Sequence, residues 1–165
     1  MRGHRGMFRF LSTCLAFLIV TTAQVGGVPP APAIPGEAAR IESMVNKAAA
    51  LVEVRGKQAF PDFRRRGSEW RFNEVYLFVM DLGGRVLLNV EFPRREGTNR
   101  LKERDADGKL FHEDFIDVVR SDGSGWVDYM FPRPGQKHPS AKWSYVRAVT
   151  IDGEPGLIGA GFYAE

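Results

Sequence analysis

Hydrophobic residues recur at helical spacing in two segments of the chain, 37–54 and 111–120. Each segment gathers its apolar side chains on one side of a helix, so both are predicted to be amphipathic helices that cover a core. Gly56 is a suitable end for the first helix, and a short second helix is predicted over 57–63. The apolar positions are Ile41, Met44, Val45, Ala48, Leu51 and Val52, followed by Phe111, Phe115, Val118 and Val119.

Between and after these helices the apolar residues follow strand patterns. The run 75–80 is apolar throughout and rich in aromatic and β-branched residues, which predicts a strand covered on both faces. The turn 81–84 ends in two glycines and leads into a second strand over 85–90, so the pair predicts a hairpin. Three more strands are predicted over 126–131, 142–151 and 156–163.

This order of elements predicts a single α+β domain over residues 37–165. A long helix, two strands, a second helix and three strands together favour one five-stranded antiparallel sheet with helices packed on it. The segment holds about 130 residues, enough for one hydrophobic core and too few for two. Residues 24–36 are rich in proline, which favours extended geometry, and they are predicted to be a linker.

The first 23 residues have the pattern of a cleavable secretory signal. Three arginines and no acidic residue precede an apolar run over 10–20, and small residues follow up to Ala23. The apolar run and the small residues that follow it, 10–23, cover 14 residues, whereas a membrane-spanning helix needs ~20, so a retained anchor is the less favoured alternative. Lipidation at Cys14 is disfavoured because most of the apolar run follows that cysteine.

Removal of this signal changes what the composition implies. The full chain has a net charge of +3 and a pI of 9.2, and a basic composition of this kind would suggest a nucleic-acid partner. The signal carries away three arginines, and the 20 basic residues that remain balance the 20 acidic ones, so no nucleic-acid partner is predicted. Cys14 is the single cysteine, so the mature protein has no thiol nucleophile or thiolate ligand. We expect a periplasmic or secreted protein with no membrane span after cleavage.

The chemical motifs of the chain favour neither an enzyme nor a metal or cofactor site. Asp105 and Asp107 begin like a calcium loop, but the later oxygen ligands and the glycine of such a loop are missing. His112 and Glu113 are neighbours on a predicted helix and face different directions, so they cannot share one ion. Ser124 follows a helix, whereas the serine of a nucleophile elbow follows a strand.

Aromatic residues on the predicted strands are the more informative feature. Tyr129 and Phe131 are two residues apart and share one face of their strand, and Trp143, Tyr145 and Arg147 share one face of theirs. Tyrosine hydroxyls and a cation on a sheet face suit a small carboxylate, because the hydroxyls donate hydrogen bonds and the cation neutralises charge. The alternative is an ordinary aromatic core with a surface arginine.

Two motifs carry a family resemblance. Gly-Ser-Gly-Trp-Val-Asp-Tyr at 123–129 and Lys-Trp-Ser-Tyr-Val at 142–146, with Pro132 and the Pro-Gly pair at 134–135 between them, resemble the second half of bacterial single Cache domains. The resemblance extends from residue 41 to residue 163. It implies a PAS-like fold, in which a long N-terminal helix packs on a five-stranded antiparallel sheet and one sheet face holds a pocket for a small ligand.

By this resemblance the pocket would bind a small, anionic ligand and no cofactor. Two positions depart from the family pattern: Phe131 stands where relatives often have tryptophan, and Asn89 stands where the second strand often ends in histidine. These departures leave the identity of the ligand open. The ligand-binding residues implied are Trp70, Tyr76, Phe78, Tyr129, Phe131, Lys142, Tyr145 and Arg147.

Receptors of this family continue from the last strand into a membrane helix and an output domain. Here the sequence ends at Glu165, so our expectation is a free, exported sensor domain that acts through a separate partner such as a membrane sensor protein. The alternative is a non-catalytic structural or interaction module whose pocket is filled by its own side chains. A hydrolytic enzyme is the least favoured hypothesis.

Overall fold

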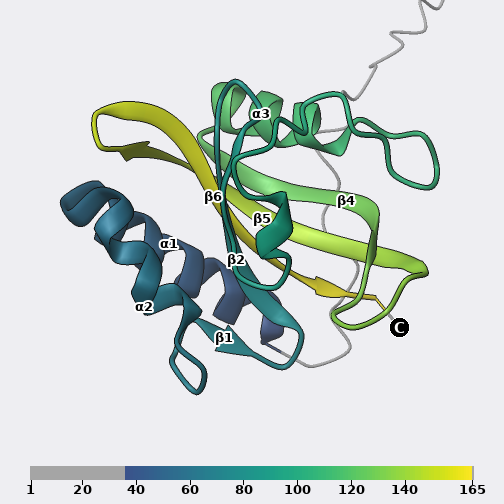
Figure 1. Ribbon diagram of the computed structural model, residues 1–165, viewed down its shortest axis with the longest axis horizontal. Helices are drawn as coiled ribbons and strands as arrows, with labels where there is room; N and C mark the ends of the chain where they lie inside the picture. Colours follow the sequence, from purple (N-terminus) through teal and green to yellow (C-terminus); the bar gives the residue numbers. More distant parts are fainter. Residues whose placement is uncertain (1–35, 165) are drawn as a thin grey trace, which may run out of the picture.

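The computed structural model describes residues 36–164, so the predicted signal and nearly all of the predicted linker lie outside the described residues. One antiparallel sheet, in the order β1-β2-β6-β5-β4 with β3 paired to β2, carries helices on its two faces (Figure 1). The strands are β1 (Arg71–Phe72), β2 (Val75–Asp81), β3 (Val86–Asn89), β4 (Ser124–Pro132), β5 (Pro139–Ile151) and β6 (Glu154–Tyr163). The helices are α1 (Glu37–Arg55), η1 (Gly56–Ala59), α2 (Phe60–Arg64), η2 (Pro93–Arg95) and α3 (Phe111–Ser121).

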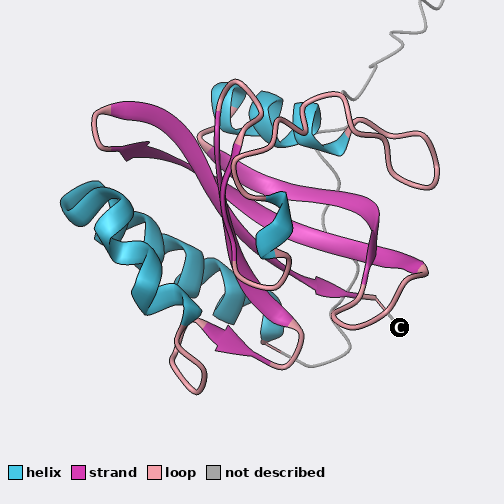
Figure 2. Cartoon of the chain, viewed as in Figure 1, coloured by secondary structure: helices cyan, strands magenta, loops and turns pink. Residues whose placement is uncertain are grey.

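Helix α1 covers one face of the sheet with the apolar stripe predicted for it. Ile41, Val45 and Val52 are fully buried in one core with Leu77 of β2 and Ile158 of β6. The helix lies along β5 and β6, as Figure 2 shows for the long cyan helix beside the magenta sheet. Burial of this stripe fixes which face of every strand points towards α1, because side chains alternate along a strand.

The opposite face carries α3 and the irregular segment between β3 and α3. A second core on this side contains Phe115 and Val119 of α3, Phe78 and Met80 of β2, and Leu157 of β6. Leu77 and Val79 face α1 whereas Phe78 and Met80 face α3, which confirms the prediction that 75–80 is a strand covered on both faces. The sheet therefore separates two hydrophobic layers.

The prediction of an α+β, PAS-like fold with a long N-terminal helix on an antiparallel sheet is confirmed. The structure adds β1, a two-residue strand that pairs Arg71 with Tyr76, and so has six strands where five were predicted. It also extends the fourth predicted strand back to Pro139, which pairs with Pro132 at the end of the β4–β5 hairpin. Prolines at both ends of that hairpin made the segment resemble a loop, but proline is tolerated at the first residue of a strand.

Within residues 36–164, no helix combines the length and the apolar character that crossing a membrane requires.

Candidate functional site

A pocket lies on the α3 side of the sheet, between the strands and the irregular segment that follows β3. It encloses about 350 Å³ of space not occupied by protein atoms, part of which is open to solvent. The part of it that a water-sized sphere can enter is only about 20 Å³, far below the ~300–1,000 Å³ of small-molecule sites, so side chains fill most of this pocket. The lining is aromatic and apolar with a few polar groups: Tyr76, Phe78, Val79, Met80, Val86, Asn89, Arg95, Phe111, His112, Phe115, Tyr129, Phe131 and Lys142.

Lys142 is the most unusual side chain of this pocket. Its register in β5, opposite Tyr129 of β4 and Tyr163 of β6, points it to the α3 side of the sheet, where only 1% of it is exposed. Its Nζ donates a hydrogen bond to the Tyr76 hydroxyl at 2.9 Å and lies 4.1 Å from the centre of that ring. Among residues 36–164, no carboxylate lies within 4.0 Å of this nitrogen.

Burial controls the charge of this amine. Loss of hydration lowers the pKa of Lys142 to about 7, a shift that the more distant Glu74 carboxylate partly opposes. The ring faces of Tyr76 and Tyr163, 4.1 and 4.8 Å from Nζ, also favour the cation. Near neutral pH, Lys142 is therefore divided between its neutral and charged forms.

Three tyrosines, at positions 76, 129 and 163, carry hydroxyls on this side of the sheet. The Tyr129 hydroxyl is 3.0 Å from Ser144 Oγ, the Tyr76 hydroxyl is 3.5 Å from that of Tyr163, and the Tyr163 hydroxyl donates to the Pro132 carbonyl at 2.6 Å. Burial raises the pKa of Tyr76 and of Tyr129, and raises that of Tyr163 to about 12. All three therefore stay protonated at neutral pH as hydrogen-bond donors.

Arg95 and His112, which line the pocket, form a cluster with Glu103, which lies in the irregular segment before α3. Arg95 Nη1 donates to Glu103 Oε1 at 3.0 Å, and Nη2 donates to Oε2. His112 Nδ1 is buried without a hydrogen-bond partner, 3.7 Å from Glu103 Oε2. Desolvation lowers the pKa of His112 to about 4, so its imidazole is neutral at physiological pH.

Five of the eight residues predicted for the site line this pocket: Tyr76, Phe78, Tyr129, Phe131 and Lys142. Trp70, Tyr145 and Arg147 do not line it, so the structure does not bring all eight residues together. The Tyr145 ring packs on Trp126 at 5.5 Å on the α1 side, and Arg147 Nη1 donates to Asn46 Oδ1 of α1 at 2.8 Å.

The reason for this division is the alternation of side chains along a strand. Lys142 and Tyr145 are an odd number of residues apart, as are Lys142 and Arg147, so they point to opposite faces of β5. Trp70 precedes the sheet and packs edge-on against Phe63 of α2 at 5.1 Å. A lysine and an arginine from this strand cannot both reach one ligand.

Sequence reasoning missed the residues contributed by α3 and the loop. Phe111, His112 and Phe115 belong to one buried side of α3, and a stripe that includes position 112 was a signal that this histidine faces the core. Arg95 had no comparable signal, because it lies in a polar segment without periodicity. Within residues 36–164, no group of three or more His, Cys, Asp or Glu side chains is arranged to hold a metal ion.

Comparison with known proteins defines the family. A sequence profile described as a Cache domain matches residues 65–165, more than half of the chain. This chain belongs to the Cache domain family. Its fold is that of a single, PAS-like Cache domain, and the periplasmic sensor domain of a chemotaxis protein has the same fold, with a TM-score of 0.65 and 30% identity over 77% of this chain and 94% of the other.

Two further relatives are a chemotaxis protein and a chemosensory domain. The methyl-accepting chemotaxis protein McpP of Pseudomonas putida KT2440 is 29% identical over 93 residues, which are 56% of this chain and 17% of that receptor. This chain therefore spans about a sixth of the length of the curated relative that it matches. A Cache chemosensory domain studied for carboxylic acid recognition has a TM-score of 0.67 at 24% identity, over 79% of this chain and 95% of the other, and this likeness supports the fold.

Proposed function

We propose that this protein is an exported, non-catalytic sensor domain that binds a small carboxylate in the pocket around Lys142. The observation that carries the proposal is a buried lysine amine without a carboxylate partner among the described residues, facing a pocket lined by aromatic rings. A buried cation is costly unless it is paired, so a bound anion would complete this site. The residues proposed to contact the ligand are Tyr76, Phe78, Tyr129, Phe131 and Lys142.

The donors around Lys142 favour a carboxylate over other small ligands. The lysine amine has three donor hydrogens and gives one to Tyr76, which leaves two for a ligand. The protonated Tyr129 hydroxyl adds a neutral donor, and the rings of Phe78 and Phe131 suit a short apolar tail. A structural neighbour known for carboxylic acid recognition supports the same ligand class.

A second candidate is an interaction module whose pocket is closed by its own side chains. The packing of Phe92 edge-on against both Phe131 at 5.3 Å and Tyr76 at 6.0 Å favours it, because these rings fill space next to the amine. In that case the domain would bind a protein through its surface, and small acids would not bind.

We further propose that the domain works outside the cytoplasm and passes the binding signal to a membrane sensor protein. The predicted signal at 1–23 supports export, and the chemotaxis relatives support a signalling partner. Amino-terminal sequencing of protein recovered from the periplasm tests the export step. A new terminus near residue 24 is expected, whereas an intact Met1 terminus would contradict cleavage.

Calorimetry and thermal unfolding with acetate, propionate and butyrate test the ligand class. The acids should bind and raise the free energy of unfolding by ~2.7 kcal/mol at a concentration of 100 Kd. The matching amides, which have the same size without the charge, are expected not to bind. Equal binding of acids and amides would contradict a role for Lys142 as the anion partner, and no binding of either would favour the interaction module.

Two tyrosines on opposite faces of the sheet provide a matched test of where the site lies. Tyr129→Phe removes a hydroxyl that lines the pocket and should weaken propionate binding by about threefold to tenfold, the effect of one lost hydrogen bond. Tyr145→Phe makes the same change on the α1 side and should leave the affinity unchanged. The reverse order of effects in isothermal titrations would assign the ligand to the α1 face.

A further inference from the structure

The pocket is lined by two basic side chains, Lys142 and Arg95, of which only Arg95 is paired with an acidic residue within the described part of the chain. Lys142 has no acidic partner within 4.0 Å among the described residues, whereas Arg95 makes a two-point ion pair with Glu103. A two-point pair of this kind uses both outer nitrogens of the guanidinium and neutralises its charge. The Arg95 and Glu103 side chains are only 15% and 26% exposed, so solvent screens their interaction weakly.

We propose that Glu103 is a specificity-determining residue, which occupies Arg95 and so restricts the pocket to ligands with a single negative charge. This inference rests on the proposed carboxylate site and extends it from a ligand class to a charge rule. Lys142 supplies the one cation that a ligand can neutralise, because Glu103 already neutralises the charge of Arg95. A dicarboxylate would have to displace Glu103 from Arg95 or leave its second charge unpaired in an aromatic pocket, which is costly.

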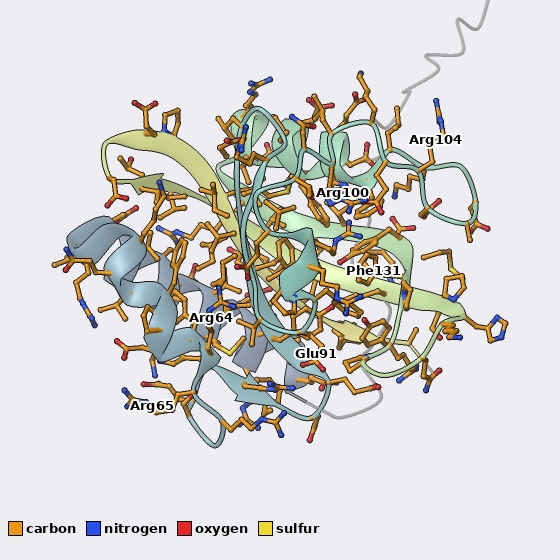
Figure 3. The ribbon with its side chains drawn as sticks, in the orientation of Figure 1. Arg64, Arg65, Glu91, Arg100, Arg104 and Phe131 are labelled. Carbon is orange, nitrogen blue, oxygen red and sulfur yellow. The ribbon has the colours of Figure 1, made fainter. Side chains whose placement is uncertain are left out.

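Both cations line the pocket beside one aromatic ring. Each lies near the Phe131 ring: Arg95 Cζ is 5.1 Å and Lys142 Nζ is 5.5 Å from the centre of that ring. Figure 3 shows Phe131 near the middle of the molecule, below Arg100 and Arg104 in this view. Without Glu103, the same pocket would offer Arg95 as a second cation for a ligand carboxylate.

The surroundings of Glu103 explain why its charge matters more than its shape. Its Oε1 is 3.9 Å from Arg100 Nη1, so this one carboxylate faces two guanidinium groups. The nearby His112 is neutral and supplies no compensating charge. Glu103→Gln keeps the size of the side chain and one acceptor for Arg95, but it removes the negative charge that opposes a ligand carboxylate.

The test compares propionate with malonate and succinate by isothermal titration of the full-length protein. Glu103→Gln should bind the dicarboxylates roughly tenfold to a hundredfold more tightly than the wild type does, as expected for one new charge-assisted interaction. The double variant Arg95→Gln/Glu103→Gln should lose this gain, which identifies Arg95 as the group released. Glu113→Gln, the same change in an α3 residue that pairs with Lys102 and does not line the pocket, should show no gain.

The outcomes separate this inference from the proposed function. A wild type that binds no propionate contradicts the proposed function, whereas one that binds propionate and dicarboxylates equally well overturns the role of Glu103. The role of Glu103 is also overturned if Glu103→Gln folds and binds propionate but shows no higher affinity for dicarboxylates. That result is expected if the ion pair only holds the loop in place. If Glu103→Gln does not fold, Glu103→Asp, whose shorter side chain weakens the two-point pair, should shift selectivity in the same direction, and an unchanged ratio overturns the inference.

Discussion

Replacing Lys142 with methionine is expected to abolish carboxylate binding and to raise the stability of the empty domain. The two effects have one cause. The amine is 1% exposed and lacks an acidic partner within the described part of the chain, so its charge is unfavourable in the folded protein and favourable for a bound anion. Methionine fills a similar volume without a charge to desolvate.

The expected magnitudes follow from the loss of a charged partner. Propionate affinity should fall at least about a hundredfold, because the ligand loses both its counter-ion and two charge-assisted hydrogen bonds. Stability at pH 7 should rise by on the order of 1 kcal/mol, as is found when buried charges are replaced by apolar groups. Titration calorimetry and urea unfolding measure the two quantities. Lys137→Met, which changes an exposed lysine, should alter neither.

The pH dependence of unfolding gives an independent check of this assignment. The pKa of Lys142 is about 7 in the folded domain and near 10.5 in the unfolded chain, so between these values the unfolded chain binds more protons. Stability of the empty wild-type domain should therefore gain a rising contribution from pH 7 towards pH 10.5, and Lys142→Met should lack it. A variant that is less stable than the wild type and still binds propionate would make Lys142 a structural residue.

The sequence was sufficient for the fold because burial repeats regularly along its helices and strands. The stripe of α1 and the apolar run of β2 each appear as a periodic pattern, and both elements formed where they were predicted. The two-residue strand β1 was missed because so short a segment has no period. The extension of β5 to Pro139 was missed because it depends on pairing with β4, a contact between segments that periodicity does not encode.

The candidate site was predictable in part, for a related reason. Alternation within one strand should have separated Lys142 from Tyr145 and Arg147, and the family resemblance brought them together against that rule. Which face holds the pocket depends on where α1 and α3 pack, and that is a property of the folded chain. Arg95 and Glu103 lie in an irregular loop, so only the three-dimensional structure reveals that they form a pair beside Phe131.

Ligand affinity is expected to depend strongly on pH, with Lys142 as the group responsible. The pKa of His112 is lowered to about 4, and the pKa of Tyr163 is raised to about 12. The pKa values of Tyr76 and Tyr129 are also raised. These four groups therefore keep one protonation state near neutral pH. Arginine remains charged throughout. Lys142, with a pKa of about 7, is the lining residue that changes charge in this range.

A bound carboxylate raises the pKa of this amine, because an opposite charge favours the protonated form. Above pH 7 the empty pocket must therefore take up a proton to bind propionate, and the dissociation constant should increase by up to about tenfold per pH unit. At pH 8, calorimetry in buffers with different ionisation enthalpies should show uptake of close to one proton per ligand. Lys142→Arg keeps a cation that does not titrate and should bind with little pH dependence. A wild-type affinity that stays constant from pH 6 to pH 9 would mean that Lys142 is already charged in the empty pocket, and the anion would then bind to a preformed cation.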